Sequence, residues 1–201
     1  MRSNKVILAV EDTLSEAVST KILEYFNLEI VQKIGFKGNS FLKEKARNLN
    51  RTARGFYNVF LLTDLDSPTN CPPKLIQSWI NEPLNSSFLF RVAVMEIESW
   101  IMADRRGIAK FLSVPLNRIP HNTDEIEKPK EFLVSLARQS RKRTLRQELA
   151  PIQGATTAKV GPLYNPRFTE FVRDQWDLEC ASAVSVSLKR TMDRISSLYS
   201  A

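Results

Sequence analysis

The stretch "NVFLLTDLD" (Asn58–Asp66) decides the fold of this chain of 201 residues. A short, continuous apolar run of this kind is typical of a strand that is buried on both faces of a parallel sheet. Three other segments share these features, namely Lys5–Val10, Leu28–Phe36 and Phe88–Glu96. We therefore predict four strands. The two aspartates that close the third strand mark the edge of the sheet where we expect the functional site.

Helical patterns separate the predicted strands. Apolar residues recur at helical spacing in Ser15–Phe26, and residues 40–53 and 73–80 also read as helices. This alternation predicts a Rossmann-like, mainly parallel α/β sheet. After residue 97 the pattern becomes helical. We therefore expect an α/β domain at residues 1–106 and a mostly helical C-terminal extension, packed on it, at residues 107–201.

The composition limits the class of protein. Hydrophobic residues make up 43% of the chain and charged residues 25%, which is ordinary for a globular domain. No apolar run approaches the roughly 18 residues of a membrane span, and the N-terminal segment turns acidic directly after "KVILAV", so we expect neither a membrane segment nor a signal peptide. Cys71 and Cys180 lie far apart without metal-ligand spacing, which predicts reduced thiols in a cytoplasmic protein.

The net charge of +7 is unevenly distributed, with +2 in residues 1–106 and +5 in residues 107–201. The densest segment, "RQSRKRTLR", has five basic residues and no acid; this basic block consists of Arg138, Arg141, Lys142, Arg143 and Arg146. Such a patch suits a polyanion, and we predict that the block contacts nucleic acid, either DNA or RNA. The alternative is a solvated helix face.

Carboxylates gather where the predicted strands end. The candidate metal ligands are Glu11 after the first strand and, after the third and fourth, Asp64, Asp66, Glu96 and Glu98. The carboxyl ends of parallel strands meet at one edge of a sheet, and the period of two in a strand predicts that Asp64 and Asp66 share a face, as do Glu96 and Glu98 if the strand still runs there. Mg²⁺ or Mn²⁺ would remove the repulsion among them. Solvated strand ends are the alternative.

Three segments in this order, "VEDTLSE", "LLTDLDSP" and "VAVMEIESWIMAD", resemble Toprim-like proteins of the DUF4276 type, which are related to the nuclease domain of the OLD family. The resemblance covers residues 5 to about 112, and "GPLYNP", "FVRDQW" and "SVSLKR" in the tail are also similar. The residues that match the acidic positions of the family are Glu11, the pair Asp64 and Asp66, and Glu98. Two positions depart from the family: Asp12 replaces a glycine, and Glu16 lies five residues after Glu11 instead of four.

The resemblance implies a divalent-metal-dependent nuclease that hydrolyses phosphodiester bonds in nucleic acid. The catalytic residues would be Glu11, Asp64, Asp66 and Glu98, around one or two Mg²⁺ or Mn²⁺ ions that orient the phosphate. Glu96 could take the place of Glu98. The family relation also implies an ABC-type or AAA ATPase partner and a role as a phage-defence or toxin-like effector.

Two other functions remain open from the sequence. The chain could be a non-catalytic adaptor that binds nucleic acid or protein, because its basic half can bind without any chemistry. It could also be a phosphoreceiver-like switch domain that accepts a phosphoryl group on Asp64. That class should have a fourth strand ending in Ser or Thr and a fifth strand ending in Lys, whereas "EKPKEF" (residues 127–132) offers a lysine without an apolar strand before it.

Overall fold

The computed structural model describes residues 3–54, 57–152, 154 and 157–199. Its four strands form one all-parallel sheet in the order β2-β1-β3-β4. The strands are β1 (Lys5–Val10), β2 (Glu29–Gly35), β3 (Asn58–Asp64) and β4 (Phe88–Ala93). The predicted Rossmann-like α/β fold with a parallel sheet is confirmed.

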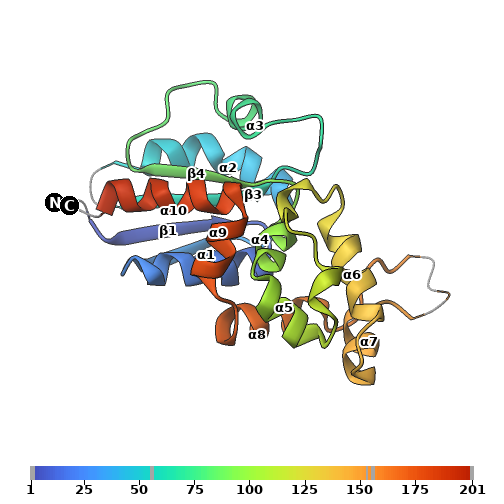
Figure 1. The fold of residues 1–201 in the computed structure, drawn as a ribbon. Coiled ribbons are helices and arrows are strands. Elements are labelled where there is room, and N and C mark those ends of the chain that lie inside the picture. Colours follow the sequence, from blue (N-terminus) through green and yellow to red (C-terminus); the bar gives the residue numbers. More distant parts are fainter. Residues whose placement is uncertain (1–2, 55–56, 153, 155–156, 200–201) are drawn as a thin grey trace.

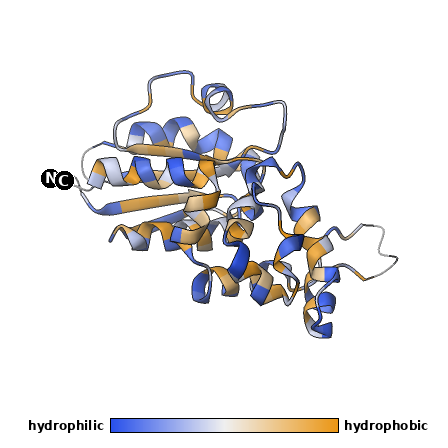
Figure 2. Ribbon diagram, in the orientation of Figure 1, coloured by the Kyte–Doolittle hydropathy of each residue, from blue (hydrophilic) through white to orange (hydrophobic). Residues whose placement is uncertain are grey.

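Helices cover both faces of the sheet, as Figure 1 shows. Alternate residues of β1 belong to different hydrophobic clusters: Val6 and Leu8 pack on the side of α1 (Thr13–Tyr25), and Ile7 packs on the side of α2 (Gly38–Thr52). The latter side also holds α3 (Pro72–Trp79). Strands buried on both faces explain the continuous apolar runs of the sequence, and Figure 2 colours them mainly as hydrophobic.

The rest of the chain is helical. Its elements are α4 (Ile97–Ala103), α5 (Arg105–Leu112), the short 3₁₀ turns η1 (Leu116–Arg118) and η2 (Thr123–Glu125), α6 (Pro129–Arg138), α7 (Arg143–Leu149), α8 (Tyr164–Asp174), α9 (Leu178–Val184) and α10 (Val186–Tyr199). Helix α8 packs against α1, and α10 packs against β4 (Figure 1). One hydrophobic cluster joins Leu8 of β1 to Phe168 of α8 and Ile195 of α10, so the core is continuous across residue 106.

Two aspartates begin helices near the sheet. Asp12 caps α1 by accepting a hydrogen bond from the Ser15 backbone N–H at 2.8 Å. Asp104 is buried and caps α5, because it accepts from the Gly107 N–H at 2.9 Å; its other oxygen accepts from the Asp177 N–H at 3.0 Å. A side-chain acceptor satisfies donors that the first turn of a helix leaves free. Asp104 therefore also fixes the chain that leads into α9.

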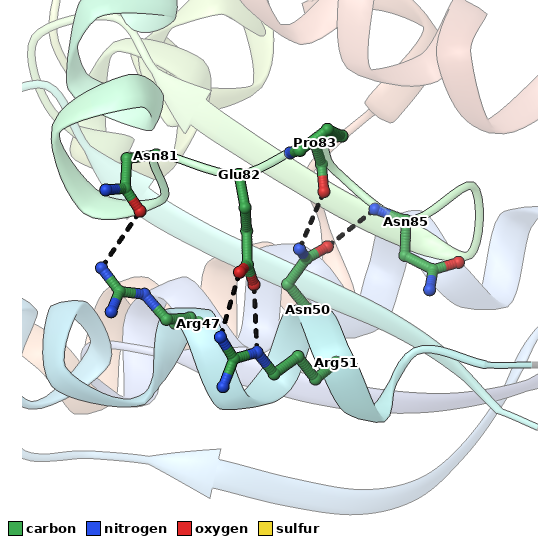
Figure 3. Close-up of polar contacts among 7 residues, drawn as sticks. All are labelled: Arg47, Asn50, Arg51, Asn81, Glu82, Pro83 and Asn85. Carbon is green, nitrogen blue, oxygen red and sulfur yellow. Dashed lines mark hydrogen bonds and ion pairs between the residues drawn. The ribbon is translucent and has the colours of Figure 1, made fainter.

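Helix α2 holds the connection between α3 and β4 in place (Figure 3). The buried Asn50 donates to the Pro83 carbonyl at 3.1 Å and accepts from the Asn85 N–H at 2.7 Å. On the exposed side of the same helix, Arg51 forms two hydrogen bonds with Glu82.

Within the described residues, no helix is both long and apolar enough to cross a membrane.

Strands β3 and β4 are shorter than predicted, and this corrects two expectations. Asp66 and Met95 have φ angles of 55° and 65°, so the chain turns in the left-handed region after each strand. The Asp66 N–H donates to the Met95 carbonyl at 2.9 Å, which holds the two turns together. Asp64 and Asp66 therefore do not share the face of a strand, and Glu96 and Glu98 lie at the start of α4 and not on β4.

The turn at Gly35 should depend on glycine. Its φ is 121°, and an added Cβ would overlap the backbone carbonyl of Val10. We expect Gly35→Ala to lower the free energy of unfolding by about 2–4 kcal/mol. Gly38→Ala is the matched control, because Gly38 also has a positive φ, of 77°, but open space around it; its cost should be about 1 kcal/mol. Urea denaturation measures both, and equal losses would contradict the role of the Val10 contact.

Candidate functional site

The candidate site lies at the carboxyl edge of the sheet, where the strand order changes direction between β1 and β3. This position is the usual ligand site of open α/β sheets. Glu11 directly follows β1, and its Oε1 accepts hydrogen bonds from the Asp64 backbone N–H at 3.0 Å and from the hydroxyl of the buried Thr63. Glu11 therefore ties the ends of the two central strands together.

Glu98 brings three helices to this edge. It lies in the first turn of α4 and is completely buried. Its Oε1 accepts from the hydroxyl of Tyr164, on α8, at 3.2 Å and lies 3.5 Å from the Nζ of Lys130, on α6. Its Oε2 is buried without a hydrogen-bond partner among the described residues. A buried carboxylate oxygen in this state is costly, because such groups are almost always satisfied by a donor or an ion.

The predicted acids form one electrostatic group, the acidic cluster, which we define as Glu11, Asp64, Asp66 and Glu98. Burial, followed by the charges of Glu98, Glu11 and Asp66, raises the pKa of Asp64 well above its ordinary value. Burial also raises the pKa of Glu11, against the hydrogen bonds from Thr63 and Asp64. These shifts show that negative charge is poorly compensated at the edge of the sheet.

Burial raises the pKa of Glu98 to about 7, although the charge of Lys130 opposes the change. Burial by itself would lower the pKa of Lys130, but Glu98, Glu96 and Asp64 together raise it. Lys130 is therefore the cation that partly neutralises the acidic cluster. Its backbone N–H also donates to Glu96 Oε2 at 2.7 Å, so Glu96 faces the start of α6.

The sequence did not predict Lys130, Tyr164 or Thr63 as members of the site. Lys130 follows Pro129, which begins α6, and Tyr164 begins α8. The tyrosine stands in "GPLYNP", one of the tail segments on which the family resemblance rests. That resemblance was the available signal for Tyr164, whereas nothing in the local pattern around Lys130 indicates that α6 starts at the sheet edge.

Asp66 and Glu16 have more peripheral positions than the other acids. Asp66 is exposed at the rim, where the side-chain amide of Asn39 lies 3.4 Å from its Oδ2. Glu16 forms an ion pair with Lys33 of β2. The structure thus brings the half-buried Glu11 and Asp64 and the buried Glu98 to one edge of the sheet with the exposed Asp66 beside them, and gives Glu16 a separate partner.

The basic block lies at the other end of α6. Arg138 closes this helix, and the helical rise of about 1.5 Å per residue places its backbone about 12 Å from that of Lys130. Arg141, Lys142 and Arg143 are exposed. Arg141 lines a hollow of about 460 Å³ together with Arg106 and Lys110, and none of the described residues that line it is acidic. The basic block is therefore connected to the acidic cluster through α6 but does not enter it.

Carboxylate oxygens are the donors that Mg²⁺ and Mn²⁺ prefer, so the chemistry of the acidic cluster suits these ions. Across residues 3–54, 57–152, 154 and 157–199, however, no three Asp, Glu, His or Cys side chains are arranged as a ready-made metal cage. Mg²⁺ usually keeps several waters and binds one or two carboxylates plus substrate phosphates, so it does not need such a cage. The free Oε2 of Glu98 and the crowded Asp64 are the groups that best suit a cation.

The burial of Glu98 should make the protein less stable above pH 7 than near pH 5. The pKa of Glu98 is about 7 in the folded chain, against 4.5 ordinarily. Between these values the folded state binds more protons than the unfolded state, so the free energy of unfolding falls as pH rises. At about 1.4 kcal/mol per pKa unit, Glu98 contributes a fall of up to about 3 kcal/mol.

Urea denaturation of the wild type and Glu98→Gln, at about pH 5 and about pH 8, measures this contribution. The fall should be smaller in Glu98→Gln. Glu82→Gln is the control, because Glu82 is paired with Arg51 at the surface and its pKa is lowered. An identical pH dependence in the wild type and Glu98→Gln would contradict the raised pKa of Glu98.

No family model, no curated protein and no solved structure matches the chain. The resemblance to Toprim-like proteins of the DUF4276 type therefore remains a prediction from the sequence motifs, and the site is interpreted from its own chemistry.

Proposed function

We propose that the protein hydrolyses phosphodiester bonds of nucleic acid with the help of a divalent metal ion. The observation that carries the proposal is the buried Glu98, one oxygen of which has no hydrogen-bond partner among the described residues and whose charge, like that of Glu11, acts on Asp64. Acidic groups that are buried together with raised pKa values are typical of functional sites. Their position at the switch point of the sheet supports the same conclusion.

Asp64, Asp66, Glu11 and Glu98 are the residues that would hold Mg²⁺ or Mn²⁺. The ion, when bound, would supply charge stabilisation to the phosphate and activate a water molecule. Glu11 positions the Asp64 backbone through its hydrogen bond. Tyr164 orients Glu98, and Lys130, beside Glu98, has an ammonium group that would donate to a phosphate oxygen of the substrate.

The distribution of acidic and basic residues supports nucleic acid as the substrate class. An acidic cluster repels a polyanion, so attraction must come from cations elsewhere on the chain. The exposed basic block and the hollow lined by Arg106, Lys110 and Arg141 supply such cations at the far end of α6. Lys130 lies at the start of α6 and Arg138, the first residue of the block, ends it, so this helix offers a short route from phosphate contacts to the acidic cluster.

A phosphoreceiver-like switch is less well supported. Lys130 does lie close enough to Asp64 for its charge to affect the aspartate, as that class requires. In the described part of the chain, however, the sheet has four strands, and the lysine comes from the start of α6 and not from the end of a fifth strand. We therefore do not propose phosphoryl transfer to Asp64.

Replacing Asp64, the last residue of β3, together with Asp66 should abolish metal binding. We expect Asp64→Asn with Asp66→Asn to weaken Mg²⁺ and Mn²⁺ binding, and metal-dependent cleavage of an oligonucleotide, by about a hundredfold or more. The fold should persist, because the double variant relieves repulsion at Asp64. Isothermal titration calorimetry and a gel-based cleavage assay measure the two effects.

The matched control for this experiment is Glu82→Gln with Asp193→Asn. It removes two acidic charges that are paired at the surface with Arg51 and Lys189. Its metal affinity and cleavage should equal those of the wild type. Unchanged metal affinity in the Asp64/Asp66 variant would refute the proposed metal site, and nucleic-acid binding without metal binding in the wild type would favour the adaptor.

The basic block should give nucleic-acid binding a steep dependence on salt. Each phosphate contact that is lost lowers the log–log slope of affinity against salt by about 0.7–0.9. The combined change of Arg141, Lys142 and Arg143 to Ala should therefore reduce the slope by about 2–3, while metal binding persists. Fluorescence anisotropy at several salt concentrations measures the slope.

Three exposed cations on and after α2 provide the control for this slope measurement: Lys43, Arg47 and Arg54. Their replacement by Ala removes the same charge from another part of the surface. A slope that falls equally in both triple variants would mean that only net charge matters. A slope that changes in neither variant would identify the basic block as a solvated surface.

A further inference from the structure

Strand β4 carries a charged residue at a position that faces the core. Leu89 and Ala93 belong to the hydrophobic cluster on the α1 and α10 side of the sheet. Arg91 lies between them, so the strand period of two directs its side chain to the same side. Arg91 is half-buried in a strand that is otherwise apolar. Arginine is rarely buried without a partner of opposite charge.

The partner of Arg91 is not an acid. Its Nε donates to the hydroxyl of the buried Thr191, on α10, at 3.2 Å. Arg190 precedes Thr191, and Arg194 follows one helical turn after Arg190, so both lie close to Arg91 (Figure 1 shows α10 beside β4). Burial, and then the charges of Arg194 and Arg190, lower the pKa of Arg91. We define these three residues as the arginine cluster.

Counter-charge is absent from the arginine cluster, as far as the described residues show: none of its members forms an ion pair there. The nearby Asp193 is paired with Lys189 at 3.0 Å. Among the described residues, Arg51, Arg167 and Arg173 do form ion pairs, as Arg51 does with Glu82 in Figure 3. Arg190 and Arg194 are exposed, whereas Arg91 is half-buried beside them, so an anion bound here would offset the repulsion among the three cations.

We propose that Arg91, Arg190 and Arg194 form a binding site for a phosphate group, supplied either as free phosphate or by the backbone of a nucleic acid. Guanidinium groups bind phosphate through paired N–H donors. Three such groups therefore suit a phosphate better than a carboxylate on a flexible surface as the bound anion. The site is independent of hydrolysis at the acidic cluster. Along β4, Arg91 lies two residues, or about 7 Å, before Ala93, which pairs with Asp64 of the acidic cluster.

A different role for Arg91 makes a different prediction. Strand β4 is at the edge of the sheet, and a charged residue on an edge strand prevents pairing with another chain. That role needs only Arg91 and gives no reason for Arg190 and Arg194 to have affinity for phosphate. Phosphate binding therefore separates the two explanations.

The test is a calorimetric titration of inorganic phosphate into the full chain at constant ionic strength. Arg190→Gln with Arg194→Gln should lower the affinity for phosphate by about tenfold or more. The control, Lys43→Gln with Arg47→Gln, removes two exposed cations one turn apart on α2 and should bind as the wild type does. No binding to the wild type, or equal affinity in all three proteins, would overturn the proposal.

Two further measurements complete the test. Without phosphate and at low salt, the Arg190/Arg194 variant should melt at the same or a higher temperature than the wild type, because repulsion of Arg91 is relieved; a lower melting temperature would overturn the repulsion argument. Binding of a single-stranded oligonucleotide identifies the source of the phosphate. A salt slope lower by about 1.4 in the variant indicates the nucleic-acid backbone, and an unchanged slope with lost phosphate affinity indicates free phosphate.

Discussion

The complete burial of Glu98 is the constraint on which the site and the helical half of the protein depend. A carboxyl group at this position needs donors, and the chain supplies them from two distant helices through Tyr164 and Lys130. These contacts direct the first turns of α8 and α6 to the edge of the sheet. The helical half therefore completes the electrostatics of an edge that the strands alone would leave with uncompensated negative charge.

The two turns that leave the sheet give the site its shape. A strand that continued to Asp66 or Glu98 would present their carboxylates in a row. The left-handed residues Asp66 and Met95 instead turn the chain, and the hydrogen bond between their backbones keeps both turns close. As a result Asp66 stays at the solvent-exposed rim, whereas Glu98 enters the interior. Residues two apart in sequence, Asp64 and Asp66, therefore experience different environments.

The strands and their acidic ends could be predicted from the sequence, because apolar runs and the convergence of parallel strands are local and general rules. Glu11 and Asp64 lie at this edge, as these rules predict. The turns could not be predicted, since Asp66 and Met95 adopt left-handed conformations without a glycine to signal them. Lys130 could not be predicted either, because its position depends on how α6 packs. Arg91 was visible as a charge within an apolar strand, but its neighbours on α10 are about 100 residues away in the sequence.

The continuous core across residue 106 has a consequence for the synthesis of the protein. The α1 side of the sheet shares a hydrophobic cluster with α8, which packs on α1, and with α10, which packs on β4; both helices leave the ribosome after the whole sheet. Until they emerge, apolar residues of β1 and β4 on that face lack their final neighbours. The α/β part therefore cannot finish its core until these helices have emerged, and a nascent chain before that stage would expose a surface that chaperones recognise.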